Sequence, residues 1–285
     1  MSDANTPVAV ITGASSGIGK EAAKALVAKG WHVIAHGRDA GRSAAAEAEI
    51  RAAAAPGAVV EMISGDLASL SDVAQIADQI ATLTNKVDVL LNNAGGMRTE
   101  LVITPEGNDA SFAGNHLGHF MLTKRLMPQL RAAGSARVIN TSSDGHFYCK
   151  DIDWDDLQLM KDWNSGNSYC LVKLCNVMFA LELAKRAAAD GIVAHAFHPG
   201  VVASNFTAHV VESTRAYMAT LDAQSPEDAA RPLVWLATSA EAGALTGLYW
   251  NQSVAEAPNP IALDDAATAR LWVESERLVA KAGFK

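Results

Sequence analysis

Apolar and polar residues alternate along the chain in segments of two lengths. Short apolar runs, typical of buried strands, are each followed by a longer amphipathic stretch, typical of a helix. We expect strands over Val8–Thr12, His32–His36, Val59–Ile63, Val87–Leu91, Arg137–Thr141 and Val193–Phe197. We expect helices over Gly17–Lys29, Arg42–Ala55, Leu70–Leu83, Asp109–Ala133 and Tyr169–Ala189. This order predicts an α/β fold with one doubly wound parallel sheet and helices on both faces.

Two stretches interrupt the regular pattern. Residues 146–167 carry a cluster of aspartates and two tryptophans, and residues 204–225 follow the sixth expected strand. Both stretches come after the carboxyl end of a strand, and in an open parallel sheet ligands bind at that edge. A chain of 285 residues can bury one large core. We therefore expect a single domain over residues 1–285, with insertions near 146–167 and 204–225 that shape the ligand site.

The composition narrows the classes of partner. Hydrophobic residues make up 49% of the chain and charged residues 19%, and the formal net charge is −8. Because phosphate binding needs a concentrated basic face, this balance argues against a nucleic-acid partner. We see no secretory signal and no apolar run long enough to span a membrane, and the three cysteines favour reduced thiols. We therefore expect a cytoplasmic protein without a membrane span.

A glycine-rich loop lies between the first expected strand and the first expected helix. It reads Thr12-Gly13-Ala14-Ser15-Ser16-Gly17-Ile18-Gly19. Glycines permit a tight turn and a close approach to a pyrophosphate, and the helix that follows offers free N–H groups and a favourable dipole. A glycine pattern alone also fits a structural turn, but its place between strand and helix predicts a dinucleotide site.

Further motifs follow in a characteristic order. They are Asn92-Asn93-Ala94-Gly95, Ser142-Ser143, Tyr169-Cys170-Leu171-Val172-Lys173 and Pro199-Gly200. With the T-G-x-x-x-G-x-G spacing of the glycine loop, this set resembles the short-chain dehydrogenase/reductase family over nearly the whole chain. The stretches 115–120, 197–202 and 271–276 are similar to its retinol-dehydrogenase branch. The resemblance implies a Rossmann-type fold and an oxidoreductase that uses a nicotinamide cofactor.

Tyr169 and Lys173 stand four residues apart, so both face one side of the expected helix. A free tyrosine has a pKa of about 10, and we expect the nearby ammonium group to lower the pKa of Tyr169. Tyr169 can then donate a proton in reduction and accept one in oxidation. The resemblance implies that Ser143, rather than Ser142, binds the substrate oxygen. It also implies that Asn115 supports a water-linked proton relay to Lys173.

The end of the second expected strand distinguishes NAD from NADP. Enzymes that use NAD tend to place an acid there, which binds the ribose 2′-hydroxyl. Gly37 occupies this position and Arg38 follows it, and an arginine can bind a 2′-phosphate bidentately. Asp39 is the alternative acid if the register is shifted, although it also fits the cap of the next helix. We expect NADP(H) as the cofactor.

The resemblance implies cofactor contacts from several separate segments of the chain. These contacts are Gly13, Ser15, Ser16, Gly17, Ile18, Gly19, Arg38, Asp66, Leu67, Asn93, Ala94, Gly95, Tyr169, Lys173, Pro199, Gly200, Val202 and Ser204. Asp66 and Leu67 match the pair that holds the adenine. Lys173 would also bind the nicotinamide ribose, and Ser204 replaces a threonine that reaches the carboxamide.

The residues expected around the substrate are mostly apolar. Met97, His146, Phe147, Tyr148 and the segment 205–221 favour a pocket for a lipophilic alcohol or carbonyl compound. We expect hydride transfer between NADP(H) and such a substrate, and the resemblance implies a homodimer or homotetramer. The alternatives are a xenobiotic or biosynthetic ketone or quinone reductase, or a dinucleotide-binding regulator that has lost catalysis. The complete set of catalytic residues argues against the regulator.

Two features could indicate a metal site. His116 and His119 lie three residues apart, but no carboxylate or cysteine nearby completes a ligand set. The aspartates of 151–156 lack the glycine and the terminal glutamate of a calcium-binding EF-hand loop. We therefore expect packing roles for the histidines, a solvated acidic loop, and no metal.

Overall fold

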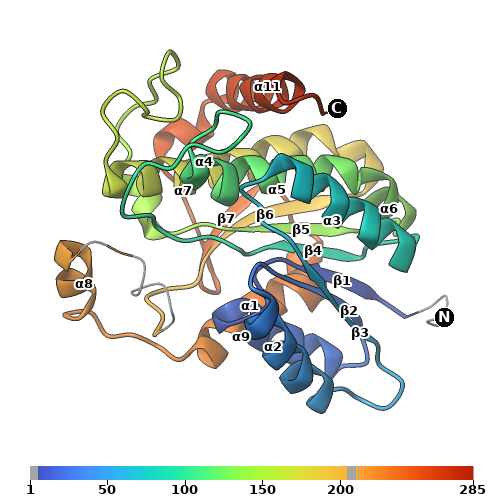
Figure 1. The fold of residues 1–285 in the computed structure, drawn as a ribbon. Coiled ribbons are helices and arrows are strands. Elements are labelled where there is room, and N and C mark those ends of the chain that lie inside the picture. The colour runs from blue at the N-terminus through green and yellow to red at the C-terminus, as the bar shows by residue number, and fades with distance from the viewer. Residues whose placement is uncertain (1–5, 204–209, 211, 285) are drawn as a thin grey trace.

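The computed structural model describes residues 6–203, 210 and 212–284. Among them, eight strands form one sheet in the order β3-β2-β1-β4-β5-β6-β7-β8 (Figure 1). The strands are β1 (Val8–Ile11), β2 (His32–Gly37), β3 (Val60–Ser64), β4 (Val89–Asn92), β5 (Arg137–Thr141), β6 (Val193–His198), β7 (Leu248–Asn251) and β8 (Val254–Glu256). All neighbours are parallel except β7 and β8, which are antiparallel. The predicted doubly wound parallel sheet is confirmed, and β7 and β8 extend it beyond the six expected strands.

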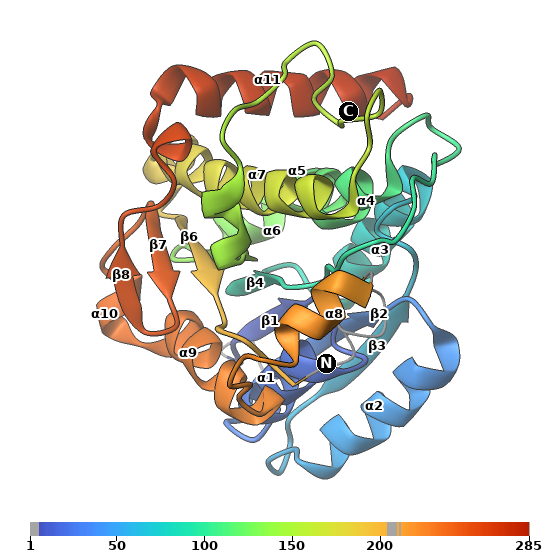
Figure 2. The same ribbon diagram turned by 90° about the vertical axis from the view of Figure 1, so that its left-hand side faces the viewer.

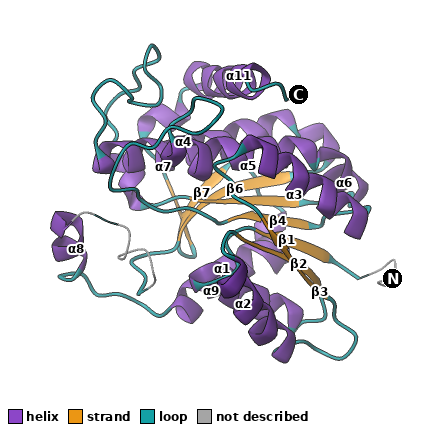
Figure 3. Ribbon diagram, viewed as in Figure 1, coloured by secondary structure: helices purple, strands orange, loops and turns teal. Residues whose placement is uncertain are grey.

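Helices cover both faces of this sheet (Figures 1 and 2). One face carries α1 (Gly17–Val27), α2 (Ala40–Ala52) and α9 (Pro226–Thr238). The other carries α3 (Leu70–Leu83), α5 (Gly118–Arg125), α6 (Met127–Ala132) and α7 (Ser165–Arg186). Successive strand residues point to opposite faces, so Val10 and Leu90 belong to one buried cluster and Ile11 and Leu91 to the other. Figure 3 shows the strands enclosed between the two layers of helices.

The helical stretch expected over Asp109–Ala133 is confirmed in extent, but the structure divides it into shorter pieces. Asp109 caps the short helix α4 (Ala110–Phe112), a π-helical turn follows over Ala113–Leu117, and α5 and α6 complete the segment. Pro128 lies in the first turn of α6. Proline lacks an N–H donor, so it fits the start of a helix and not its interior, which explains the break before α6.

The structure also corrects the start of α7. It begins at Ser165 rather than at Tyr169, because the side chain of Asn164 accepts hydrogen bonds from the N–H groups of Gly166 and Asn167. Tyr169 therefore lies in the second turn of an established helix. The remaining helices are α8 (Glu212–Met218), α10 (Ala240–Gly243) and α11 (Asp265–Lys281).

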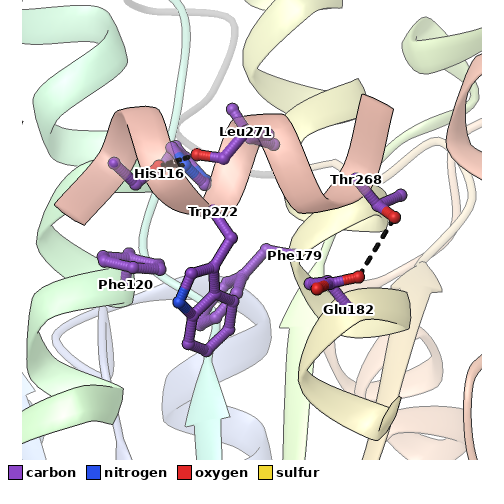
Figure 4. Close-up of a pocket in the computed structure, with 8 residues that line it drawn as sticks. His116, Phe120, Phe179, Glu182, Thr268, Leu271 and Trp272 are labelled. Atoms are coloured by element: carbon purple, nitrogen blue, oxygen red, sulfur yellow. Dashed lines mark hydrogen bonds between the residues drawn. The ribbon is translucent and has the colours of Figure 1, made fainter. Parts of the chain in front are cut away.

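Helix α11 packs across α7 on the outside of the second helical layer (Figure 1). Figure 4 shows Trp272 of α11 beside Phe120 and Phe179, with the dashed bond from Thr268 to Glu182 next to them. The Phe120 and Trp272 rings meet edge to face, with centroids 4.9 Å apart. The side chains leave no room for a water molecule between them. This region is therefore a packed interface within the chain and not a ligand site.

The strand order indicates where a ligand binds. It reverses between β1 and β4, and in open parallel sheets ligands bind at the carboxyl edge beside such a reversal. The irregular stretch that follows β5 and helix α8 both lie toward this edge (Figure 2). Of the second expected insertion, residues 204–209 and 211 lie outside the described residues.

Candidate active site

The glycine loop packs directly against the turn that follows β4. Gly13 has a φ of +68°, and a Cβ placed on it would lie 2.8 Å from the Cα of Ala94. A Cβ on Gly19 would lie 2.5 Å from the carbonyl oxygen of Gly13. The Thr12 hydroxyl accepts hydrogen bonds from the N–H groups of Asn93 and Ala94, at 2.9 and 3.0 Å. Side chains at either glycine would separate the two loops, so the motif residues are needed for this contact.

The start of α1 fits a pyrophosphate group. Ser16 occupies the N-cap position in an extended conformation, but its side chain makes no capping hydrogen bond. The first turn carries no acidic residue, and Gly17 has a φ of +57°. Ile18 is partly buried and packs on the core below. The helix therefore presents N–H groups and the positive end of its dipole toward the site, which favours a bound anion.

The end of β2 leaves no space for an acidic side chain at position 37. A Cβ on Gly37 would collide with the Oγ of Ser43 and would lie 2.8 Å from the Cβ of Ser15. Asp39 does not replace it, because its carboxylate caps α2 and accepts a hydrogen bond of 2.8 Å from the N–H of Arg42. Of the two roles considered for Asp39, the structure therefore supports the helix cap.

Arg38 and Asp66 face each other where β2 and β3 end. Their charged groups lie 3.9 Å apart and both side chains are substantially exposed, so this pair holds Arg38 only weakly. Leu67 lies beside them, but its side chain is buried in the core and its carbonyl packs close to Gly118. Any contact of Leu67 with an adenine would therefore come from its backbone.

The segment after β5 and helix α7 bring Ser143, Tyr169 and Lys173 together. Ser143 follows β5, and its hydroxyl hydrogen-bonds with the phenol of Tyr169, which α7 supplies. The Ser143 hydroxyl also donates to Asp144 at 2.9 Å and accepts from the N–H of Gly145 at 3.1 Å. Lys173 lies one turn further along α7, with its Nζ 5.5 Å from the centre of the Tyr169 ring.

Ser142, by contrast, is turned away from the pocket. It is buried, and its hydroxyl donates a 2.7 Å hydrogen bond to the carbonyl of Lys173. The Nζ of Lys173 donates to the carbonyl of Thr141 at 3.2 Å, and the amide of Asn176 donates to the same oxygen at 3.1 Å. Ser142 therefore joins β5 to α7, while Ser143 contacts Tyr169.

The pKa values of the two α7 residues move in opposite directions. Burial raises the pKa of Tyr169, and the hydrogen bond with Ser143 lowers it by a smaller amount. This is the reverse of the lowering expected from Lys173. Burial also lowers the pKa of Lys173, to about 8, because its ammonium group is removed from water. Near neutral pH the protein therefore holds a protonated phenol beside a lysine that is easily neutralised.

Asn115 lies in the π-helical turn and brackets the turn after β4. Its Oδ1 accepts a hydrogen bond from the N–H of Gly96, and its Nδ2 donates to the carbonyls of Gly96 and Ser111. A Cβ on Gly95 would lie 2.5 Å from Asn115 Oδ1 and 3.3 Å from Lys173 Nζ. Gly95 thus leaves the space in which Asn115 and Lys173 approach each other.

The segment after β6 is held by Gln224, which none of the sequence motifs includes. The side chain of Gln224 donates to the carbonyl of Pro199, and its backbone pairs with Val201 and Ala203. Gly200 has a φ of +82°, and a Cβ there would collide with Gln224. Val202, which forms a bridge with Gln224, is buried. Ser204 lies outside the described residues.

His146 was expected to line the substrate pocket, and the structure places it elsewhere. It is fully buried, it contacts the carbonyl of Ser143 at 2.6 Å, and it accepts from the N–H of Asn259 at 3.1 Å. It therefore connects the turn that begins at Ser143 to the segment around Asn259. Phe147 and Tyr148, the next two residues, are exposed. The positions of these three side chains follow from a 3-10 turn, which sequence periodicity does not reveal.

The described residues contain no group of three or more histidines, cysteines, aspartates and glutamates placed to hold a metal ion. His116 hydrogen-bonds with Ser275 of α11 at 2.9 Å, while His119 points to the opposite side, toward Thr12. Within the described part of the chain, no helix combines the length and apolar character needed to cross a membrane.

The sheet order, the glycine loop and the Ser143–Tyr169–Lys173 group define the class of protein. A family model described as short chain dehydrogenase matches residues 7–152, about half of the chain, and the chain belongs to this family of oxidoreductases.

Retinol dehydrogenase 13 of Homo sapiens is 37% identical over 278 residues, which cover 95% of this chain and 83% of that protein. A putative uncharacterized protein from Mycobacterium paratuberculosis aligns over 98% of this chain and 97% of its own, with a TM-score of 0.77 and 29% identity. The RhlG/NADP active-site complex of Pseudomonas aeruginosa aligns over 88% and 95% of the two chains, with a TM-score of 0.70 and 25% identity.

Proposed function

We propose that this chain is an NADP(H)-dependent oxidoreductase that transfers a hydride between the nicotinamide and a hydrophobic alcohol or carbonyl compound. The observation that carries this proposal is the meeting of Ser143, Tyr169 and Lys173 at the carboxyl edge of the sheet, beside the glycine loop. We treat residues 1–285 as one catalytic domain, with the segments 146–167 and 204–225 shaping its substrate side.

The residues present fit the cofactor. Uncapped N–H groups at the start of α1 suit the pyrophosphate, and Lys173 is placed for the nicotinamide ribose. The turn Asn93–Gly95 and the segment Pro199–Val202 form the walls on either side. When bound, NADP(H) supplies or accepts the hydride, while the protein provides orientation and electrostatics.

Tyr169 acts as the general acid and base in this proposal. In reduction its phenol gives a proton to the oxygen of the carbonyl group, and in oxidation its phenolate, formed by loss of the phenol proton, takes the proton of the alcohol. Its raised pKa keeps the proton in place at neutral pH, as an acid requires. The Ser143 hydroxyl exchanges its bond to Asp144 for one donated to the same substrate oxygen. Asn115 and Lys173 lie together at Gly95, where a water chain can replace the proton that Tyr169 gives up.

NADP rather than NAD is favoured by the end of β2. Gly37 has no room for the acid that would bind a 2′-hydroxyl, and Arg38 is exposed and only weakly paired. A guanidinium group in that place suits a 2′-phosphate. The Pseudomonas aeruginosa structure, which was solved with NADP, adds support from a relative of similar fold.

A lipophilic substrate is favoured by the relatives and by the surface beside the site. The similar human protein is named a retinol dehydrogenase. Exposed apolar side chains lie on the segments that follow β4 and β5: Leu101, Val102, Ile103, Phe147 and Tyr148. An apolar rim favours a ligand whose own apolar surface leaves water on binding. A cytoplasmic location and a homodimer or homotetramer complete the proposal.

The test is a turnover panel with both cofactors. Purified protein is mixed with NADPH or NADH and with long-chain, aryl and retinoid aldehydes, alongside small polar ketones and hydroxy acids. We expect oxidation of NADPH with the lipophilic carbonyls and little with NADH. The variant Tyr169→Phe serves as the control for contaminating activity. A preference for small polar substrates would refute the lipophilic pocket, and equal rates with NADH would refute the cofactor preference.

A further inference from the structure

His119 is a buried titratable residue that the proposed mechanism does not use. It lies one helical turn after Asn115, at the start of α5, and is 1% exposed. Its Nδ1 lies 3.1 Å from the carbonyl oxygen of Asn115, and its Nε2 lies 2.9 Å from the hydroxyl of Thr12. One ring thus contacts both the glycine-loop motif and the π-helical turn.

The hydrogen bonds around His119 fix its tautomer. A carbonyl oxygen only accepts, so Nδ1 must carry the proton that faces Asn115. The Thr12 oxygen already accepts from the N–H groups of Asn93 and Ala94, so it has its own proton left to give. It gives this proton to Nε2 of His119 at 2.9 Å rather than to the carbonyl of Leu91 at 3.3 Å, because a bare buried ring nitrogen would otherwise stay unpaired.

The ring is neutral in this arrangement. A proton on Nε2 would face an oxygen whose two lone pairs are already used. Burial also lowers the pKa of His119, to about 3, and the positive charge of Lys173 and the nearby His36 act in the same direction. His119 is therefore a fixed donor on one side and a fixed acceptor on the other, not a pH switch.

The two partners of His119 hold the Asn93–Gly96 turn from opposite ends. Thr12 binds the N–H groups at the start of the turn, and the Asn115 side chain binds the N–H and carbonyl of Gly96 at its end. The same turn packs against Gly13 and makes room for Lys173. A displacement of either partner would therefore move both the cofactor wall and the proton relay.

We propose that His119 is a positioning residue that couples the glycine loop to Asn115, through one hydrogen bond to each. The bond to Thr12 fixes the position of the turn that forms one wall of the cofactor site. The bond to Asn115 fixes the position of the Asn115 carbonyl and side chain, which belong to the proton relay. This inference rests on the proposed function, because it assigns the two bonds to cofactor affinity and to turnover.

Two variants of similar size each keep one of these bonds. In His119→Asn, the amide nitrogen takes the place of Nδ1 and keeps the donor to Asn115, while Thr12 loses its acceptor. In His119→Gln, the amide oxygen reaches the place of Nε2 and keeps the acceptor for Thr12, while Asn115 loses its donor. His116→Asn is the matched control, because His116 is equally buried on the same segment but bonds to Ser275 on the far side.

NADPH affinity is measured by calorimetry, and kcat with the best carbonyl substrate of the panel. A neutral hydrogen bond corresponds to about a two- to tenfold change in an equilibrium or rate constant. We expect His119→Asn to weaken NADPH binding by that factor with kcat nearly intact, and His119→Gln to lower kcat by that factor with binding nearly intact. His116→Asn should lower the melting temperature and change neither quantity. The double variant Thr12→Ser/His119→Gln should still bind NADPH nearly as tightly as the wild type, because a bond between residues 12 and 119 is preserved.

Unchanged binding and turnover in both His119 variants would overturn the proposal, as would an equal loss in His116→Asn. If the wild-type protein itself fails to bind NADPH, the proposed function fails instead. Nitrogen NMR of the wild-type histidine rings gives a test that needs no variant. We expect a neutral His119 ring protonated at Nδ1 from about pH 5 to pH 9, and the opposite tautomer or a titration in this range would refute the assignment.

Discussion

Polar side chains behind the cofactor edge are buried and hydrogen-bonded, whereas the segments that follow β4 and β5 expose large apolar groups. Thr12, Asn115 and Lys173 are 0%, 4% and 3% exposed. Ile103 and Tyr148, which lie after β4 and β5, are 51% and 67% exposed. Each of the three buried side chains makes at least one hydrogen bond within the fold, and the exposed apolar groups form a surface that a ligand can cover.

This difference suggests that the two regions control different properties: the buried region the reaction rate and cofactor binding, and the exposed region the choice of substrate. A buried, satisfied polar network is costly to disturb, because any member left unpaired carries the full desolvation penalty. Exposed apolar residues on irregular segments can be exchanged with little effect on the fold. We therefore expect substitutions in the first region to change rate or cofactor binding, and substitutions in the second to change substrate preference.

The largest effect is expected from Tyr169→Phe. Loss of the transferable proton should lower kcat by about 10²- to 10⁴-fold, the usual range for general acid–base catalysis, while NADPH affinity changes little. Steady-state kinetics and calorimetry measure the two quantities. Tyr148→Phe removes a hydroxyl from an exposed tyrosine at the same edge and serves as the control. A Tyr169→Phe variant that keeps more than a tenth of kcat would contradict the mechanism.

Arg38→Ala is expected to come next. Loss of a charge-assisted bond to the 2′-phosphate amounts to about 1.5–3 kcal/mol, or about one to two decades in NADPH affinity. NADH, which lacks that phosphate, should bind nearly as before. Arg42→Ala is the matched control, because Arg42 is also exposed on the same segment but pairs with Asp39. Equal losses for NADPH and NADH in Arg38→Ala would exclude Arg38 as the phosphate-binding residue.

Lys173→Met should lower turnover and cofactor binding, but it should stabilise the cofactor-free protein at pH 7. Burial holds the pKa of Lys173 at about 8 against an ordinary value of 10.5, so the folded state disfavours the charged form. Removing that charge should raise the free energy of unfolding by about 1–3 kcal/mol. The carbonyl of Thr141 keeps a donor, because Asn176 also binds it.

The pH dependence of this gain has a definite sign. Between about pH 8 and pH 10.5 the unfolded wild-type chain binds more protons at Lys173 than the folded one, so wild-type stability rises with pH relative to the variant. The advantage of Lys173→Met should therefore be full below pH 8 and vanish near pH 10.5. Denaturant unfolding at several pH values measures it, and a constant difference would show that Lys173 is not destabilised by burial.

The smallest effect is expected from Tyr148→Ala on the apolar rim. We expect a KM for lipophilic carbonyls that is higher by less than about tenfold, with kcat and the melting temperature nearly unchanged, because the side chain is mostly exposed in the free protein. Val273→Ala removes an exposed apolar group from α11, away from the site, and is the control. A large loss of stability in Tyr148→Ala would place this residue with the buried region instead.

The sequence by itself determined six strands of the sheet, the cofactor loop and the set of candidate catalytic residues. Short apolar runs alternate with amphipathic stretches, so the strands can be found from local pattern. The glycine loop, the Asn-Asn-Ala-Gly turn and the Tyr-x-x-x-Lys pair each consist of residues close together in the chain, so they can be found in the same way. It also separated Ser143 from Ser142 as the better candidate by resemblance. The motif set further anticipated that Gly37 and Arg38 end the second strand.

Only the tertiary structure decided how these pieces act together. His119 and Thr12 are 107 residues apart, and His146 and Asn259 are 113 apart, so no local pattern reveals either pair. The direction of the Tyr169 pKa shift depends on burial, which outweighs the hydrogen bond with Ser143. Position 37 is closed by Ser43, a residue of the next helix. In each case the deciding quantity is the approach of atoms from distant segments, which packing fixes and periodicity does not.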